Sequence, residues 1–517
     1  MRCPAMPCPS AMRRGRTPQV GWPPRWRRFL LALAAGSVCS CAVGPNFKTP
    51  EAPQVKGYTA EPLPPQTSED AQKYVEGMDI PGQWWTLFHS QALNDLVEQS
   101  LESNPTLQAA QATLRQANEN VAAQRGTFFP QVQASYDFSR NRDATGTLQP
   151  TLNSNAAVYN LHTAQVSVSY ALDIFGLEQR QLESAQALAD SQRYNLEAAY
   201  LTLTSNVVTA AIQEASLRAQ IAATQEMLGS ERESAKILRH QFELGAIAQT
   251  DVMAQDAAVA NLEATLPPLQ KQLAEQRHLL AALAGRFPSE EPAQKFELSE
   301  LSLPLEIPVS LPAALVRQRP DVLASEAQLH QASAQLGVAT ANLFPQITLS
   351  GAYGGTSTVF SQLFKTGNTF WSVGGNLSQT LFQGGTLIHQ RRAAAAALDA
   401  AGAQYRSVVL AAFQNVADAL TALQLDADAV NANLKAEQAA ADSLKATRHN
   451  VEIGLASYLA LLNAQQAYSQ AVLNLAQARA NRYSDTAALL QALGGGWWNR
   501  ESARTKQAGT RQATSTH

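Results

Sequence analysis

Four segments of the chain alternate between apolar and polar residues. In the first, Gln131-Val-Gln-Ala-Ser-Tyr-Asp-Phe138, every second side chain from Val132 to Phe138 is apolar or small and those between are polar. The pattern covers residues 131–142, 163–174, 346–354 and 370–382. Period two over about ten residues predicts strands, and it is typical of tilted transmembrane strands and also of half-buried soluble strands.

Two much longer segments have the pattern of helices. Residues 177 to about 240, and 387 to about 450, contain no proline and one glycine each. At ~1.5 Å per residue, some 65 residues make a rod of about 100 Å. Gly245 and Gly454 follow, so we expect each rod to turn there and return as a second helix. Long amphipathic hairpins need partners along their whole length.

The chain contains the same unit twice. Pro105–Gln131 aligns without a gap on Pro320–Gln346, and both copies end in Phe-Pro-Gln. Further along, Ala254-Gln255 recurs as Ala464-Gln465. We therefore expect a first repeat over 91–290 and a second over 311–493, with an exposed, Pro/Glu-rich linker at 291–310 and a tail at 494–517.

The N-terminus has the features of an export signal. Arg25–Arg28 precedes about ten apolar or small residues, too few for a spanning helix. Val38-Cys-Ser-Cys41 then resembles a bacterial lipobox, in which the cysteine is lipidated. We expect a signal peptide over 1–40 and a lipidated extension over 41–90, with Cys41 as the modified residue; a conventional signal peptide cleaved nearby is the alternative.

Charge and cysteine content exclude several classes of protein. The net charge is −3, but residues 1–40 contain seven arginines and no acid, so 32 basic residues face 42 acidic ones in the rest. An acidic body argues against nucleic-acid binding. All four cysteines lie within the first 41 residues, and the eight histidines are dispersed. No metal, cofactor or catalytic residue is therefore expected, and an enzyme is the least favoured class.

The number of strands predicts an oligomer. No stretch after residue 41 has about 18 consecutive apolar residues, so a membrane-spanning body would have to be a closed β-barrel. Four strands cannot close a barrel, because the smallest outer-membrane barrels have eight. Three copies would supply twelve strands.

Together these features resemble the outer membrane factor family, the TolC-like channel proteins, and within it the NodT-type lipoproteins of RND-type efflux. The resemblance covers about residues 41–498. The matching motifs are Cys41-Ala-Val-Gly-Pro-Asn-Phe-Lys-Thr-Pro50, Trp84-Trp-Thr-Leu-Phe88, Asn104-Pro105, the two Phe-Pro-Gln sites, Gly454-Leu-Ala-Ser-Tyr-Leu-Ala-Leu-Leu-Asn-Ala-Gln465 and Ala492-Leu-Gly-Gly-Gly-Trp497.

The resemblance implies a mixed α and β fold. Long helical hairpins would form a periplasmic helical barrel, and four strands per protomer would contribute to a trimeric, 12-stranded transmembrane β-barrel. The protein would be a homotrimer, lipid-anchored in the outer membrane and spanning the periplasm. It would act as a passive conduit for drugs or other small toxic compounds, with a periplasmic adaptor protein, an inner-membrane RND pump and outer-membrane lipid as partners.

The resemblance also implies a gate at the hairpin tips. Gly245, Gly454 and Ala456 would contact the adaptor. In relatives the constriction often carries acidic rings and an Arg–Asp tether. Here Asp251 matches a family acid, but Ala460 and Asn463 occupy positions that often carry acids, and Ala456 and Gln466 positions where relatives carry arginine. Leu459 would then supply an apolar ring that gates by dewetting; the alternative is that Leu459 and Leu462 are hairpin core.

Two other functions fit parts of the pattern. The same architecture serves as the outer-membrane channel for type I protein secretion, which differs in its partner. A non-channel periplasmic scaffold lipoprotein would need the helices but no alternating strands.

Overall fold

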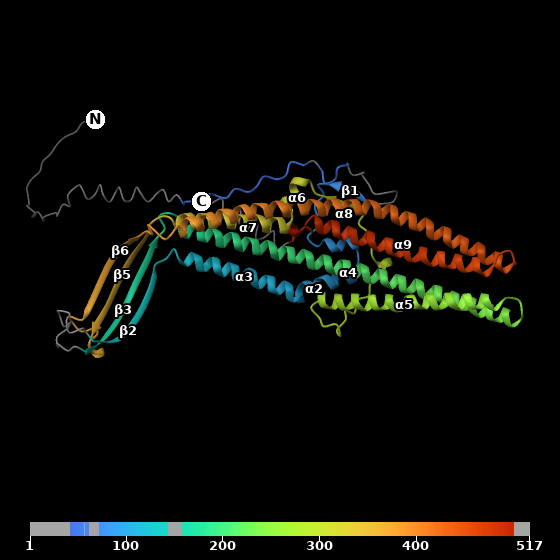
Figure 1. Ribbon diagram of the computed structural model, residues 1–517, viewed down its shortest axis with the longest axis horizontal. Coiled ribbons are helices and arrows are strands. Elements are labelled where there is room, and N and C mark those ends of the chain that lie inside the picture. The colour runs from blue at the N-terminus through green and yellow to red at the C-terminus, as the bar shows by residue number, and fades with distance from the viewer. Residues whose placement is uncertain (1–41, 56, 62–71, 143–157, 501–517) are drawn as a thin grey trace, which may run out of the picture.

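The computed structural model describes residues 42–55, 57–61, 72–142 and 158–500. The molecule is long and narrow: a sheet lies at one end, two helical hairpins reach the other, and a mixed region lies between (Figure 1). The expected signal peptide, Cys41 and the tail from residue 501 lie outside the described residues.

The four alternating segments form one antiparallel sheet with the strand order β2-β3-β5-β6. The strands are β2 (Gln131–Arg142), β3 (Val158–Leu172), β5 (Gln346–Ser357) and β6 (Thr369–Ser378). β3 starts earlier and β5 ends later than their alternation predicts. The extra residues are paired in the ladder, for example His162 with Ser357, although glycine and threonine weaken the pattern there.

The register places the apolar residues of all four strands on one face. Directly opposed residues in antiparallel strands share a face of the sheet. One row across the sheet is Val132, Val168, Gly351 and Val373, and a neighbouring row is Ala134, Val166, Tyr353 and Trp371. The row between them is Gln133, Ser167, Ala352 and Ser372. The sheet therefore has one apolar face and one polar or small-residue face.

Each repeat contains the same three long helices. They are α3 (Pro105–Gly126), α4 (Leu177–Glu243) and α5 (Gln249–Leu283) in the first repeat, and α7 (Pro320–Ala341), α8 (Thr386–Glu452) and α9 (Tyr458–Ala492) in the second. The lengths agree pair by pair at 22, 67 and 35 residues. The predicted rods are α4 and α8, and the predicted fold class is confirmed.

The shorter helices are joined end to end by equivalent contacts in the two repeats. Asn104 caps α3 and also donates from Nδ2 to the carbonyl of Leu283, the last residue of α5, at 2.9 Å. Arg319, at the corresponding cap of α7, donates from Nη1 to the carbonyl of Ala492, the last residue of α9, at 3.1 Å. Carbonyls at a helix C-terminus lack intrahelical partners. These hydrogen bonds therefore satisfy a free carbonyl at the end of one helix and hold the next helix in line with it.

A region that we call the waist surrounds the helices where they meet end to end. It combines residues 72–101, 287–319 and 489–500, and its core includes Trp84, Phe88 and Leu315. Its elements are β1 (Lys73–Glu76), η1 (Trp84–Phe88), α2 (Gln91–Ser103), η2 (Leu298–Glu300), β4 (Glu306–Val309), α6 (Pro312–Gln318) and η4 (Trp497–Asn499).

Two segments expected at the surface contribute to this core instead. In the expected linker 291–310, β4 pairs with β1 in parallel, and Phe296 and Ile307 are buried. At the start of the expected tail, Trp497 is buried and donates from its indole nitrogen to the carbonyl of Gln318 at 2.6 Å. Their composition indicated exposure, but segments far away in the chain cover their apolar residues.

Within the described residues, α8 is long and apolar enough to cross a membrane by length and composition. Only 33% of its most apolar window is buried. The helix is rich in alanine, as in Ala393–Ala397, and packs against α7 and α9. The alanine content suits close helix packing as well as a lipid environment.

Candidate functional site

The apolar face of the sheet is exposed. On β6, Trp371 is 74% exposed, Val373 80% and Leu377 66%. Val132 and Tyr353, on strands β2 and β5, are also more than half exposed. A contiguous exposed apolar surface of this kind marks contact with lipid or with another protein. The opposite face carries serine, threonine, glutamine and glycine, which suits water.

Aromatic residues lie at both ends of this sheet. At the end far from the helices, the Tyr136 hydroxyl lies 2.8 Å from Nδ1 of His162, and Phe138 and Phe360 contact the same imidazole. At the helical end, Phe175 stacks on Phe344 with ring centroids 5.0 Å apart. Two aromatic belts separated by an apolar band are typical of a transmembrane β-sheet.

Both hairpins turn through a glycine with positive φ. Gly245 has φ +75° and Gly454 has φ +77°, and nothing lies within 4 Å of a Cβ built on either. The requirement is therefore for the left-handed backbone, which glycine adopts at least cost. Figure 1 shows the two turns side by side at the tip end.

The predicted gate and adaptor residues lie at this tip. Leu459 is 64% exposed, so in one protomer it is not hairpin core. Asn463 and Gln466 are exposed on the first turns of α9, and Ala456 is half-buried in the turn before it. Asp251 lies in the first turn of α5, close enough to influence the Tyr458 phenol.

The sequence patterns did not predict one contact between the two hairpins. The Tyr458 hydroxyl donates to Oε1 of Gln241 at 2.7 Å and so ties the start of α9 to the end of α4. Burial raises the pKa of Tyr458, the Gln241 bond lowers it, and the charge of Asp251 raises it; the net shift is upward. The phenol therefore keeps its proton at neutral pH. Nothing in local periodicity could pair residues 217 positions apart.

The segment just after the expected lipidation site is fixed to both repeats. Arg180, at the start of α4, is 3% exposed and donates to the carbonyl of Val43 at 3.2 Å and to Oδ1 of Asn46 at 2.7 Å. A Cβ on Gly44 would lie 2.6 Å from Cα of Gly337 in α7. This strap, residues 42–47, is therefore held against α4 and α7.

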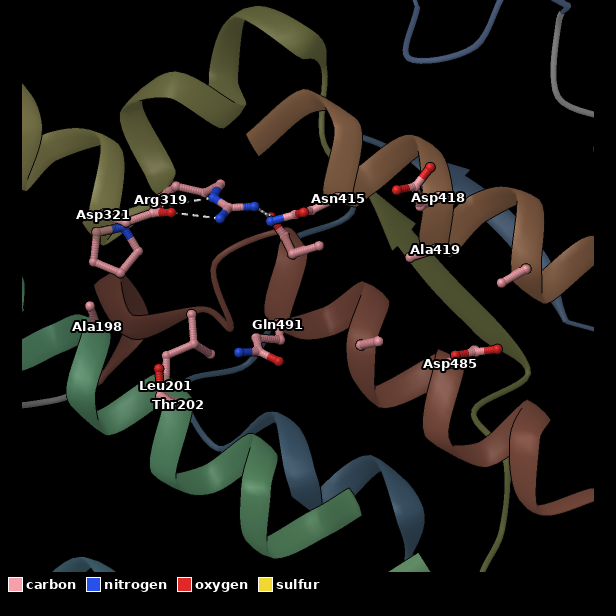
Figure 2. A pocket seen from close by; sticks show the side chains of 14 residues that line it. Ala198, Leu201, Thr202, Arg319, Asp321, Asn415, Asp418, Ala419, Asp485 and Gln491 are labelled. Atoms are coloured by element: carbon pink, nitrogen blue, oxygen red, sulfur yellow. Dashed lines mark hydrogen bonds and ion pairs between the residues drawn. The ribbon is translucent and has the colours of Figure 1, made fainter. Parts of the chain in front are cut away.

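A cavity of about 410 Å³ lies where α9 ends and α7 begins. Figure 2 shows its side chains coming from α4, α8 and α9, with Arg319 and Asp321 paired at one side. Asp418 and Asp485 lie on its other walls. The lining is mostly alanine and short polar side chains, and Arg319 is already satisfied by Asp321 and by the end of α9.

Asp485 also acts on a second aspartate, Asp426 of α8. Burial, then the hydrogen bond with Asp485 and its negative charge, raise the pKa of Asp426 to about 7, against the charge of Arg482. The two aspartates lie near each other where α8 packs against α9. Among the described residues, no group of three or more His, Cys, Asp or Glu could hold a metal ion.

Sequence comparison identifies the family. The sequence model described as "Outer membrane efflux protein" matches residues 96–286 and 311–495, which include both repeats and most of the chain. The chain belongs to the outer membrane efflux protein family. It is an outer-membrane component of an efflux system, and the prediction of a TolC-like, NodT-type protein is confirmed.

Individual efflux proteins are similar along nearly their whole length. Nodulation protein T of Rhizobium leguminosarum bv. trifolii is 27% identical over 475 residues, covering 92% of this chain and 98% of the relative. The probable efflux pump outer membrane protein TtgC of Pseudomonas putida is 28% identical over 480 residues, covering 92% and 97%.

Solved structures have the same fold. The outer-membrane channel OprN matches with a TM-score of 0.78 at 29% identity, covering 89% of this chain and all of OprN. The Campylobacter jejuni CmeC channel matches with a TM-score of 0.81 at 22% identity, covering 91% and 98%. The family and these neighbours are channel proteins rather than enzymes.

Proposed function

We propose that three copies of this efflux protein form one continuous conduit, which receives small toxic compounds from an RND-type pump through a periplasmic adaptor. The observation that carries the proposal is the sheet: it has one exposed apolar face, one polar face and two unpaired edges, β2 and β6. Edge strands pair readily, and β6 of one copy against β2 of the next would give twelve strands and close the barrel.

The helices support the same assembly. α3 continues into α5, and α7 into α9, through the contacts of Asn104 and Arg319. With α4 and α8 beside them, each protomer would supply a wall four helices wide from the sheet to the tips. Cargo would move by diffusion along this bore, and no bond would be made or broken.

The tip would be the gate and the adaptor contact. Leu459 would form an apolar ring, with Asn463 and Gln466 replacing the charged residues of relatives. Gly245, Gly454 and Ala456 would meet the adaptor, since they lie at the outermost turns. Cys41, which precedes the strap in the sequence, would anchor the protein in the membrane by its acyl chains. Several chains anchor a protein stably where one would not.

The test is photocrosslinking in cells from a photoreactive residue at Ala456, with the captured protein identified by mass spectrometry. We expect an RND-type adaptor. A matched probe at Gln470, on α9 and further from the tip, should capture far less of it.

Capture of an adaptor of an ABC exporter would replace efflux by type I protein secretion. Capture of neither adaptor from correctly localised protein would overturn the tripartite assignment and favour a scaffold lipoprotein.

A further inference from the structure

A second cavity, of about 360 Å³, lies between the two hairpins on the waist side of the tips. α4, α8 and α9 each supply part of its wall. Its apolar lining includes Met227, Leu444, Tyr468 and Val472. At its rim, Nη2 of Arg448 lies 3.4 Å from the Ser230 hydroxyl and joins α8 to α4. We call it the hairpin cavity.

One polar side chain in the cavity wall is left unsatisfied. Gln465 is 4% exposed, yet neither its Nε2 nor its Oε1 has a hydrogen-bond partner among the described residues. A buried amide without partners costs about 1–3 kcal/mol for each group left unpaired. Buried polar groups of native proteins are usually hydrogen-bonded to other protein groups or to ordered water, so these two atoms are free to pair with a bound molecule.

The duplication explains why this amide has no partner. Its counterpart in the first repeat, Gln255, is also buried, and donates to Oε2 of Glu231 at 2.6 Å and to the Glu231 carbonyl at 3.2 Å. α4 and α8 are both 67 residues long and begin at residues 177 and 386. Counted from the helix starts, Glu231 matches Ala440. By the repeat of Ala254-Gln255 as Ala464-Gln465, which is offset by one residue more, it matches Ala441, so the position is alanine at either offset. The second repeat keeps the glutamine and lacks the carboxylate.

The charges around the hairpin cavity cancel. Glu226 and Glu231 on α4 face Lys445 and Arg448 on α8. The lining therefore does not call for a charged occupant. A primary amide presents an N–H donor and a carbonyl acceptor side by side. The group that complements it best has an acceptor opposite the N–H and a donor opposite the carbonyl, as another carboxamide does.

We propose that the hairpin cavity is a binding site for a neutral organic molecule with a carboxamide-like donor–acceptor pair on an apolar or aromatic body. The pair bonds to Gln465, and the body packs on Met227, Leu444 and Tyr468. Such a molecule contacts both hairpins and holds them together. The site is built within one protomer and does not depend on the proposed adaptor or pump.

The test measures benzamide binding to the full-length protein purified from membranes in detergent, by saturation-transfer NMR. Benzamide is compared with acetophenone, which has the same shape but no N–H donor, and with benzoate, which is charged. We expect saturable benzamide binding, about tenfold weaker for acetophenone because the Gln465 acceptor is then unpaired.

Three variants locate the site. Gln465→Met removes the amide at nearly constant volume, and Ala440→Glu restores the carboxylate partner of the first repeat. Both should weaken benzamide binding about tenfold or more. Gln470→Met changes an exposed glutamine of the same helix and should leave binding unchanged.

Three results would overturn the proposal: no saturable benzamide binding, equal binding by the parent and Gln465→Met, or tighter binding of benzoate. If Gln465→Met does not assemble, Ala440→Glu decides. If neither assembles, the benzamide–acetophenone comparison on the parent decides.

Discussion

Tyr458 is the residue that joins the two hairpins at the tip. Its hydroxyl and Oε1 of Gln241 are 2.7 Å apart, and the groups around it keep the phenol protonated. A single hydrogen bond of this kind contributes about 0.5–1.5 kcal/mol net. That is enough to bias an equilibrium between closed and open tips without locking it.

Tyr458→Phe removes this bond and nothing else of the ring. We expect the open fraction of the channel to rise about two- to tenfold, measured as conductance in planar bilayers. Gln249→Ala, an exposed change at the same tip, is the control. If Tyr458→Phe and the parent had the same conductance, this hydrogen bond would not stabilise the closed state.

The lack of acids at the predicted constriction also belongs to the residue scale. Asn463 is exposed near the start of α9, where relatives often carry a carboxylate. Asn463→Asp should introduce block by trivalent cations in bilayer recordings, because three copies would form a ring of negative charge. The parent should be insensitive, as should Gln470→Asp, which lies two turns further from the tip. A parent blocked by trivalent cations would contradict the uncharged ring.

At the scale of elements, Asp426 of α8 lies near the negative charge of Asp485 on α9. The pKa of Asp426 is raised to about 7 in the folded protein, against about 4 in an unfolded chain. Between these values the folded state binds more protons, so this group's contribution to stability falls as the pH rises from about 4 to 7 and is constant above. This group therefore favours the folded state most below about pH 4.

Asp426→Asn removes this titration. We expect it to raise the free energy of unfolding at pH 8 by about 1–2 kcal/mol, after allowance for solvent screening. The apparent unfolding temperature should rise with it. The gain over the parent should shrink towards pH 5. Thermal unfolding of the purified protein across this range measures it, with the exposed Asp428→Asn as control. A gain that does not change with pH would contradict the raised pKa.

The strap is the second element whose position depends on one side chain. Arg180→Ala removes the hydrogen bonds to Val43 and Asn46. We expect faster protease cleavage within residues 42–60 while the body stays intact, measured by limited proteolysis and mass spectrometry. Arg391→Ala, an exposed change on α8, should behave like the parent. Equal cleavage of both variants would mean that other contacts hold the strap.

At the scale of the whole molecule, one protomer is incomplete. Its apolar sheet face and two strand edges are exposed at one end, and its helices form a wall open on both sides. The extensive buried core lies where the waist packs on α4, α8 and α9. Assembly and membrane insertion therefore have to bury what the single chain leaves exposed.

Val373→Lys tests which face meets lipid. A lysine near the middle of a lipid-facing strand costs about 2–4 kcal/mol, so we expect a smaller fraction of assembled protein in the outer membrane. Ser372→Lys places the same charge on the opposite face and should be tolerated. Band shifts in unheated gels measure assembly. If Ser372→Lys were the more harmful change, the polar face would not line water.

The sequence by itself determined the strands, the two rods and the duplication. These follow from periods of 2 and 3.6 residues and from self-similarity, which are properties of neighbouring residues. Tertiary structure decided which segments join the waist, which helix ends meet, and which glutamine is satisfied. Ile307, Trp497, Tyr458 and Arg319 all act on partners more than 150 positions away. Local pattern cannot specify such contacts, because their partners are chosen by how the two repeats pack.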